Sequence, residues 1–152
     1  MHLADLIGPE AVIPSLKVKT KKQLLQELSA RAAQLTGVQE RYIFDTLLQR
    51  ERLGSTGLGQ GIAIPHGRIK GLKEAKGAFL RLATPVQFDA PDGKPVGLLF
   101  VLLVPEAATE HHLQLLSELA QMFSDRPFRE QLSASPDAVA IHTLFQQWQS
   151  AN

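Results

Sequence analysis

The sequence predicts an α/β fold in which a mixed β-sheet carries helices on both faces. Helix-forming patterns stand before and after a central block of strand-like segments. That block contains both a hairpin signal, Asp92-Gly93, and long connections, so it indicates antiparallel and parallel pairing within one layered domain. Residues 96–104 are apolar on both faces and therefore predict a central strand that is covered on both sides.

Two helices are expected first. Thr20 and Gln23 have the spacing of a capping box, which indicates that a helix begins after Thr20, and Gly37 is typical of its end. A second helix is expected over residues 39–52, with Gly54 as a left-handed terminator. The first helix places its apolar residues on one stripe: Leu24, Leu25, Leu28, Ala32 and Leu35.

Strands and further helices fill the rest of the chain. Short strands are expected over residues 62–64, 77–82 and 86–88, ahead of the central strand. Helices are then expected over residues 111–123 and from about Pro127. The last helix is expected to use Ser135 as its cap and Pro136 as its first residue.

Length and composition exclude several classes of protein. The 152 residues fit one domain, residues 1–152, and the net charge of +1 with 6% aromatic residues argues against nucleic-acid or membrane partners. The chain has no cysteine, which excludes disulfides, thiolate metal sites and cysteine nucleophiles. Its longest apolar run is far shorter than the roughly 20 residues of a membrane span. With no signal-peptide pattern at its start, the protein is expected to be cytoplasmic.

Residues 50–67 form the most unusual segment, because glycines cluster there. Their backbone amides could hold an anion, or the segment could be an ordinary surface loop, and the composition alone leaves both open. A Walker loop is excluded because Gln60 follows Gly59 where a lysine is required, and the dinucleotide-binding spacing is also absent. The glycines of the segment are Gly54, Gly57, Gly59, Gly61 and Gly67.

His66 is the candidate nucleophile of this segment. It follows a short strand and Pro65, which fixes its own φ angle, and Gly67 is expected to leave space beside the ring. This pattern predicts an exposed imidazole at a strand tip, and a histidine is largely unprotonated near neutral pH. Taken alone, a histidine before a glycine is more often a surface or packing residue.

A longer pattern is more specific. The segment from Arg50 through Gly67 resembles the active-site signature of the IIA domains of the phosphotransferase system (PTS), fructose/mannitol type, and similarity continues at Phe88-Asp89, at residues 98–105 and at His112-Leu113. Within that family, the chain resembles the stand-alone nitrogen-regulatory IIA proteins. The resemblance implies the EIIA type-2 fold, which is the fold of mannitol-specific IIA.

The resemblance also implies a site. His66 would accept a phosphoryl group on Nε2 from the phosphohistidine of an HPr-like carrier, Arg50 would lie beside the phosphohistidine, and His112 would be a second histidine close to it. The family mechanism needs no metal and no cofactor. Because neighbouring helical residues project about 100° apart, His111 and His112 could not both face one metal ion. Four residues are candidates for a phosphate loop, although the two hydroxyls could merely cap the turn: Ser55, Thr56, Gly57 and Gly59.

Two functions are consistent with this resemblance. In the first, the protein is a regulatory phosphocarrier that acts through phosphorylation-dependent binding to targets such as kinases or transport regulators. It would then be a phosphotransferase only in the sense that it carries a phosphohistidine. In the second, it passes phosphate to a separate IIB chain in fructose/mannitol-type sugar uptake. A partner is expected to dock on an apolar patch around Leu58, Ile64 and Ile69, where a new phosphoryl charge would repel it.

Overall fold

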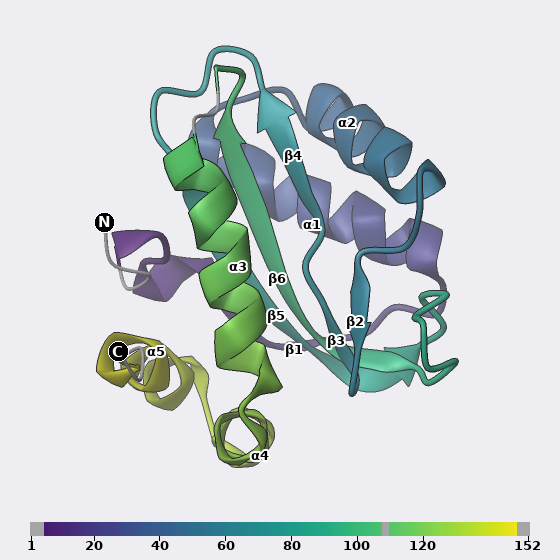
Figure 1. Cartoon of the computed structure of the whole chain (residues 1–152), viewed down its shortest axis with the longest axis vertical. Helices are drawn as coiled ribbons and strands as arrows, with labels where there is room; N and C mark the ends of the chain where they lie inside the picture. The colour runs from purple at the N-terminus through teal and green to yellow at the C-terminus, as the bar shows by residue number, and fades with distance from the viewer. Residues whose placement is uncertain (1–4, 108–109, 149–152) are drawn as a thin grey trace.

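The computed structural model describes residues 5–107 and 110–148, which form a mixed β-sheet flanked by helices (Figure 1). Within these ranges six strands make one sheet in the order β1-β5-β6-β3-β2, and β4 also pairs with β6. The predicted fold class is therefore confirmed. The strands are β1 Val12–Leu16, β2 Gly57–Gly59, β3 Ile62–Ala63, β4 His66–Ile69, β5 Lys76–Val86 and β6 Val96–Pro105.

Strand β6 is the centre of the sheet, as its apolar sequence predicts. It pairs antiparallel with β5 across the Asp92-Gly93 turn, and on its other side it pairs parallel with β3 and then β4. Strand β1 adds a parallel edge to β5. The separate strands expected over residues 77–82 and 86–88 are instead largely one strand, because β5 continues through a register shift between Arg81 and Val86.

The helices lie on both sides of the sheet. Helix α1, Lys21–Thr36, lies behind the sheet in the view of Figure 1, and α2, Glu40–Arg52, lies at the upper right beside β4. Helix α3, Glu110–Ser124, crosses the front of the sheet. Helices α4, Arg126–Ala134, and α5, Ala138–Gln147, follow at the lower left. None of the helices in the described part of the chain is both long and apolar enough to cross a membrane.

An aromatic cluster joins the sheet to the C-terminal helices. Phe145 of α5 lies with its ring centre 5.1 Å from that of Phe79 on β5 and 5.8 Å from that of Phe100 on β6. Phe123 of α3 and Phe128 of α4 pack on the same rings. The edge-to-face geometry of most of these pairs suits the quadrupoles of the rings and adds to the stabilisation from burial.

The expected end signals of the first helix are confirmed. Thr20 is the N-cap of α1 and accepts from the Gln23 N–H, while Gly37 ends the helix with a φ of 76°. The Gln23 side chain accepts from Lys19 N–H, one residue before the cap. At the end of α2, Gly54 has a φ of 151°, so it follows the C-cap Leu53 in a more extended conformation than the expected left-handed one.

The expected start of the last helix is wrong. Asp137, not Ser135, is the N-cap of α5, and its carboxylate accepts from the Ala140 N–H at 2.9 Å. Pro136 therefore lies before the helix rather than at its first position. An aspartate three residues before a helical N–H serves as a cap at least as well as a serine, so Asp137 rather than Ser135 starts the helix.

Gly67 lets helix α2 approach strand β4 closely. A Cβ atom at Gly67 would lie 2.8 Å from Cγ2 of Thr46, which is closer than real Cβ contacts allow. The expectation that Gly67 leaves space beside the His66 ring therefore misses its structural role. The missing side chain is needed on the helix side of the strand, where α2 packs.

We expect Gly67→Ala to lower the free energy of unfolding by about 1–3 kcal/mol, because overpacking at a tight contact forces the helix or strand to shift. Urea denaturation followed by circular dichroism measures this loss. Thr46→Ser removes the methyl group in question, so adding it to Gly67→Ala should recover part of the loss. An equal loss in both backgrounds would contradict the contact.

Candidate functional site

A pocket of about 660 Å³ lies where the end of α2, strand β4 and the start of α3 meet. It brings together His66, Arg50 and His112, three residues that the sequence analysis selected from distant positions. Polar and apolar side chains share the lining, so the pocket can hold an anion beside an apolar contact surface. The lining residues are Thr46, Gln49, Arg50, Arg52, Leu53, His66, Gly67, Arg68, Val104, His112, Leu113 and Leu116.

His66 begins strand β4 rather than standing free at a strand tip. Its backbone pairs with Leu102 of β6, and the residue is partly buried. Just before it, the Pro65 carbonyl accepts from the Leu102 N–H at 2.9 Å, so β3, Pro65 and β4 form one continuous parallel flank of β6. The expectation of an exposed, unobstructed imidazole is therefore wrong. The reason is that residues 66–69 pair with β6, and a strand of only four residues leaves no pattern in the sequence that reveals this pairing.

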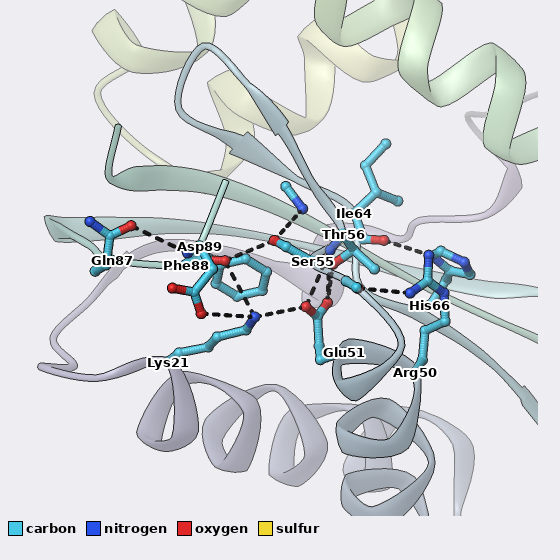
Figure 2. Close-up of polar contacts among 12 residues, drawn as sticks. Lys21, Arg50, Glu51, Ser55, Thr56, Ile64, His66, Gln87, Phe88 and Asp89 are labelled. Atoms are coloured by element: carbon cyan, nitrogen blue, oxygen red, sulfur yellow. Dashed lines mark hydrogen bonds and ion pairs between the residues drawn. The ribbon is translucent and has the colours of Figure 1, made fainter. Parts of the chain in front are cut away.

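One hydrogen bond decides the state of the His66 ring. Nδ1 lies 2.8 Å from the carbonyl oxygen of Ile64 (Figure 2). Because a carbonyl oxygen can only accept, Nδ1 must carry the hydrogen. In the neutral ring the lone pair therefore resides on Nε2, which is the nitrogen left available to a reactant.

The surroundings of His66 favour this neutral form. Burial is the largest effect on the pKa of His66 and lowers it from the usual 6.5, and the Arg50 charge lowers it further. The hydrogen bond to Ile64 and the charge of Glu51 act in the opposite direction without cancelling the shift. A lowered pKa keeps more of the imidazole unprotonated at neutral pH, so Nε2 can act as a nucleophile.

Arg50 reaches this ring from the last turn of α2. Its Nη1 donates to the Gly54 carbonyl at 2.8 Å, and Figure 2 shows the guanidinium beside the His66 ring. A guanidinium has five N–H donors in a fixed fork, so a single bond to Gly54 leaves donors for an anion bound at His66. The loop carbonyl therefore orients Arg50 without using up its capacity.

His112 lines the pocket from the first turns of α3, together with Leu113 and Leu116. Its neighbour His111 is exposed and is not part of the lining, although the two ring centres lie 5.8 Å apart. The preference for His112 over His111 therefore agrees with the geometry. Across residues 5–107 and 110–148, no three His, Cys, Asp or Glu side chains are arranged to hold a metal ion.

The four phosphate-loop candidates lie outside this pocket. The Ser55 hydroxyl donates to the Phe88 carbonyl at 2.8 Å, and the buried Thr56 hydroxyl donates to Glu51. Gly57 lies against Ala90, and Gly59 adopts a φ of 89° beside Asp92. Of the two interpretations left open by the sequence, these contacts support shaping of the loop and not phosphate binding.

Two charged residues that the sequence analysis did not assign to the site lie beneath it. The Glu51 side chain is only 3% exposed, and its carboxylate accepts from Thr56 and pairs with Lys21 Nζ at 2.9 Å. Lys21 also lies 4.4 Å from the centre of the Phe88 ring. Glu51 is the second residue of the segment that carries the family resemblance, but nothing in the local pattern shows that a lysine 30 residues earlier pairs with it.

Arg68 also lines the pocket and was not selected from the sequence. The available signal was the strand period, since residues two apart on a strand share a face and Arg68 follows His66 by two. Because the sequence predicted that His66 follows a strand rather than begins one, that period was not applied.

Comparisons with known proteins identify the family and agree with the fold. The family model for the phosphoenolpyruvate-dependent sugar phosphotransferase system, EIIA 2, matches residues 5–148. A nitrogen regulatory protein of Bradyrhizobium diazoefficiens is 49% identical over 144 residues, which are 95% of this chain and 94% of that protein.

Solved structures give the same picture. The nitrogen regulatory protein IIA-Ntr from Neisseria meningitidis has a TM-score of 0.90 and 44% identity, covering 94% of this chain and 98% of that one. The Escherichia coli mannitol IIA enzyme, solved in a complex with phosphorylated IIB, has a TM-score of 0.78 and 21% identity over 92% of this chain and 96% of its own. The latter likeness is one of fold alone, and it confirms the expected mannitol IIA-like fold.

We expect Arg50→Met to raise the pKa of His66, because it removes a nearby positive charge while keeping a long side chain in the pocket. Ring ¹⁵N shifts followed through a pH titration measure the change, and the unmodified protein should titrate below 6.5. Arg52→Met is the matched control, because Arg52 lines the same pocket but is exposed, so water screens its charge. An equal shift in both variants would contradict the specific effect of Arg50.

Proposed function

The chain belongs to the EIIA type-2 family of the phosphoenolpyruvate-dependent sugar phosphotransferase system, and we propose that it is a regulatory phosphocarrier that receives a phosphoryl group on Nε2 of His66. The observation that carries this proposal is the hydrogen bond from Nδ1 to the Ile64 carbonyl. That bond leaves the Nε2 lone pair in a pocket that also contains Arg50 and His112.

The proposed reaction exchanges one phosphorus–nitrogen bond for another. The Nε2 lone pair attacks the phosphorus of a phosphohistidine on an HPr-like donor, the nitrogen-related phosphocarrier. The donor's phosphorus–nitrogen bond breaks, and its ring nitrogen keeps the bonding pair, so no net proton transfer is required. Such a reaction needs in-line positioning and stabilisation of charge on the equatorial oxygens, which Arg50 and His112 are placed to supply.

A regulatory role is supported by the relatives. The similarity to nitrogen regulatory proteins extends over nearly the full length of both chains. We therefore propose that the phosphorylation state of His66 controls binding to protein targets, such as kinases or transport regulators, in the cytoplasm. In this sense the protein is a phosphotransferase with a phosphohistidine intermediate rather than an enzyme with a small-molecule product.

The docking surface that we propose for donor and targets is not the patch expected from the sequence. Ile64 and Ile69 are buried, and Leu58, although 45% exposed, lines a different pocket with Ala120 and Phe123. The exposed apolar side chains at the His66 pocket are instead Leu53, 86% exposed at the end of α2, and Leu113, 58% exposed on α3. A partner docked across both would cover His66, so a phosphoryl charge there would oppose its binding.

We expect His66→Ala to fold normally and to take up no phosphate. Incubation with labelled phosphoenolpyruvate, enzyme I and the HPr-like carrier, followed by mapping of acid-labile label, tests this. His112→Ala should slow uptake about 10-fold or more if its ring stabilises the transition state, whereas His111→Ala should not. Acid-labile label on the His66→Ala variant would refute the assignment.

We expect Leu113→Ser to weaken donor use, raising KM several-fold with little change in kcat, because it removes apolar contact area and no reacting group. Val139→Ser is the matched control, since Val139 is 72% exposed on α5 and lies outside the pocket. Excess unphosphorylated donor should also displace a bound target. Simultaneous binding of both proteins, or equal effects of the two substitutions, would contradict the shared surface.

A second candidate function is transfer from His66 to a separate IIB chain. It is favoured by the fold neighbour that is solved with phosphorylated IIB. Passage of label from the phosphorylated protein to a purified fructose/mannitol-type IIB chain would support this function. Retention of label on His66, with target binding that depends on it, would support regulation.

A further inference from the structure

A chain of polar contacts runs from helix α1 to the His66 ring (Figure 2). Lys21 Nζ lies 2.9 Å from Glu51 Oε2, and the Glu51 carboxylate accepts from the Thr56 N–H at 3.2 Å. The Thr56 carbonyl accepts from the Ile64 N–H at 3.1 Å, and the Ile64 carbonyl accepts from His66 Nδ1 at 2.8 Å. The buried ion pair is thus connected to the bond that selects the His66 tautomer.

The same carboxylate also determines where Arg50 is held. Arg50 Nη1 donates to the Gly54 carbonyl, and Gly54 lies two residues before Thr56. Glu51 closes this turn because its carboxylate accepts from both the N–H and the hydroxyl of Thr56, while the Gly54 N–H donates to the Glu51 carbonyl. The turn that presents the Gly54 carbonyl to Arg50 is therefore closed on Glu51 from two sides.

The arrangement requires an ionised carboxylate. Glu51 is almost fully buried, and a buried charge is tolerated only when it is paired and hydrogen-bonded. Lys21 supplies the opposite charge and Thr56 supplies two donors, so the lone pairs of Glu51 are used in directions that fix the loop. Glu51 does not line the pocket, so it contacts the site only through these partners, and its charge acts on the His66 ring from a distance.

We propose that Glu51, held by Lys21, is the positioning residue of this site: through Thr56 it fixes both the Ile64 carbonyl that sets the His66 tautomer and the Gly54 carbonyl that orients Arg50. The effect on transfer rate rests on the proposed function. The effect on the His66 ring does not, because the tautomer is a property of the protein without phosphate.

Glu51→Gln tests the inference, since glutamine keeps the shape of the side chain and removes the charge and one acceptor. We expect the His66 ring ¹⁵N signals to move from the Nδ1–H form toward a mixture with the Nε2–H form. Phosphate uptake should fall on the order of 10–100-fold, as misplacement of reacting groups predicts. The matched control is Glu74→Gln, because Glu74 is an exposed glutamate that pairs with Lys76 at 3.0 Å, far from the loop in sequence. It should change neither readout.

Two substitutions at Thr56 keep the test decisive if Glu51→Gln does not fold. Thr56→Val removes only the hydroxyl donor and should produce the same shift in the ring signals, and Thr56→Ser restores the hydroxyl and should rescue both readouts. An unchanged tautomer in folded Glu51→Gln or Thr56→Val protein overturns the inference, whatever the rate. If the unmodified protein takes up no phosphate, the proposed function fails, and the ring signals still decide the role of Glu51.

Discussion

The structure depends on strand β6 having two different flanks. On one side β5 pairs antiparallel with it, and on the other β3 and β4 run parallel to it. Because β6 is buried on both faces, a one-residue slip of either flank would turn apolar side chains away from the core. The register that places His66 opposite Leu102 is therefore set by the packing of the core, which in turn fixes the position of His66 in the site.

Pro65 is where this framework becomes a site. It has no N–H, but its carbonyl still accepts from Leu102, so the parallel flank continues past it. On the side away from β6, the segment of β3 and Pro65 pairs with β2 only as far as Gly57 and Thr56, because the residues before Thr56 come from the end of α2. The Ile64 carbonyl then accepts from the His66 ring instead of from a neighbouring strand. A gap in the sheet pairing thus supplies the acceptor that orients the imidazole.

The elements that the sequence predicted are those governed by long patterns. The buried strand β6, the helices α1 and α2 and the two end signals of α1 follow from such local signals, and all are present. Of the three short strands, only β3 was predicted, from the apolar residues 62–64. Strands β2 and β4 have three and four residues, too few for a period to be recognised, and they are stabilised by their partners. The Lys21–Glu51 pair joins two helices across the fold, so no local pattern could reveal it. The site formed by His66, Arg50 and His112 was predicted from the family resemblance rather than from residue spacing.

Neighbouring charges at the end of α2 act on the site in opposite senses. Arg50 lies at the pocket and lowers the pKa of His66, while Glu51 is buried beneath it and raises that pKa. Burial adds to the effect of Arg50, so the ring is a weaker base than a free imidazole. A weaker base is also a better leaving group, so a phosphoryl group on it would be easier to pass on.

For the proposed carrier the basicity of His66 matters in both directions, because the ring must attack as a neutral nucleophile and later release the phosphoryl group. Glu51 limits how far the pKa falls, and at the same time it fixes the loop that keeps Arg50 in place. The pair of adjacent residues can therefore set both the basicity and the geometry of a single imidazole.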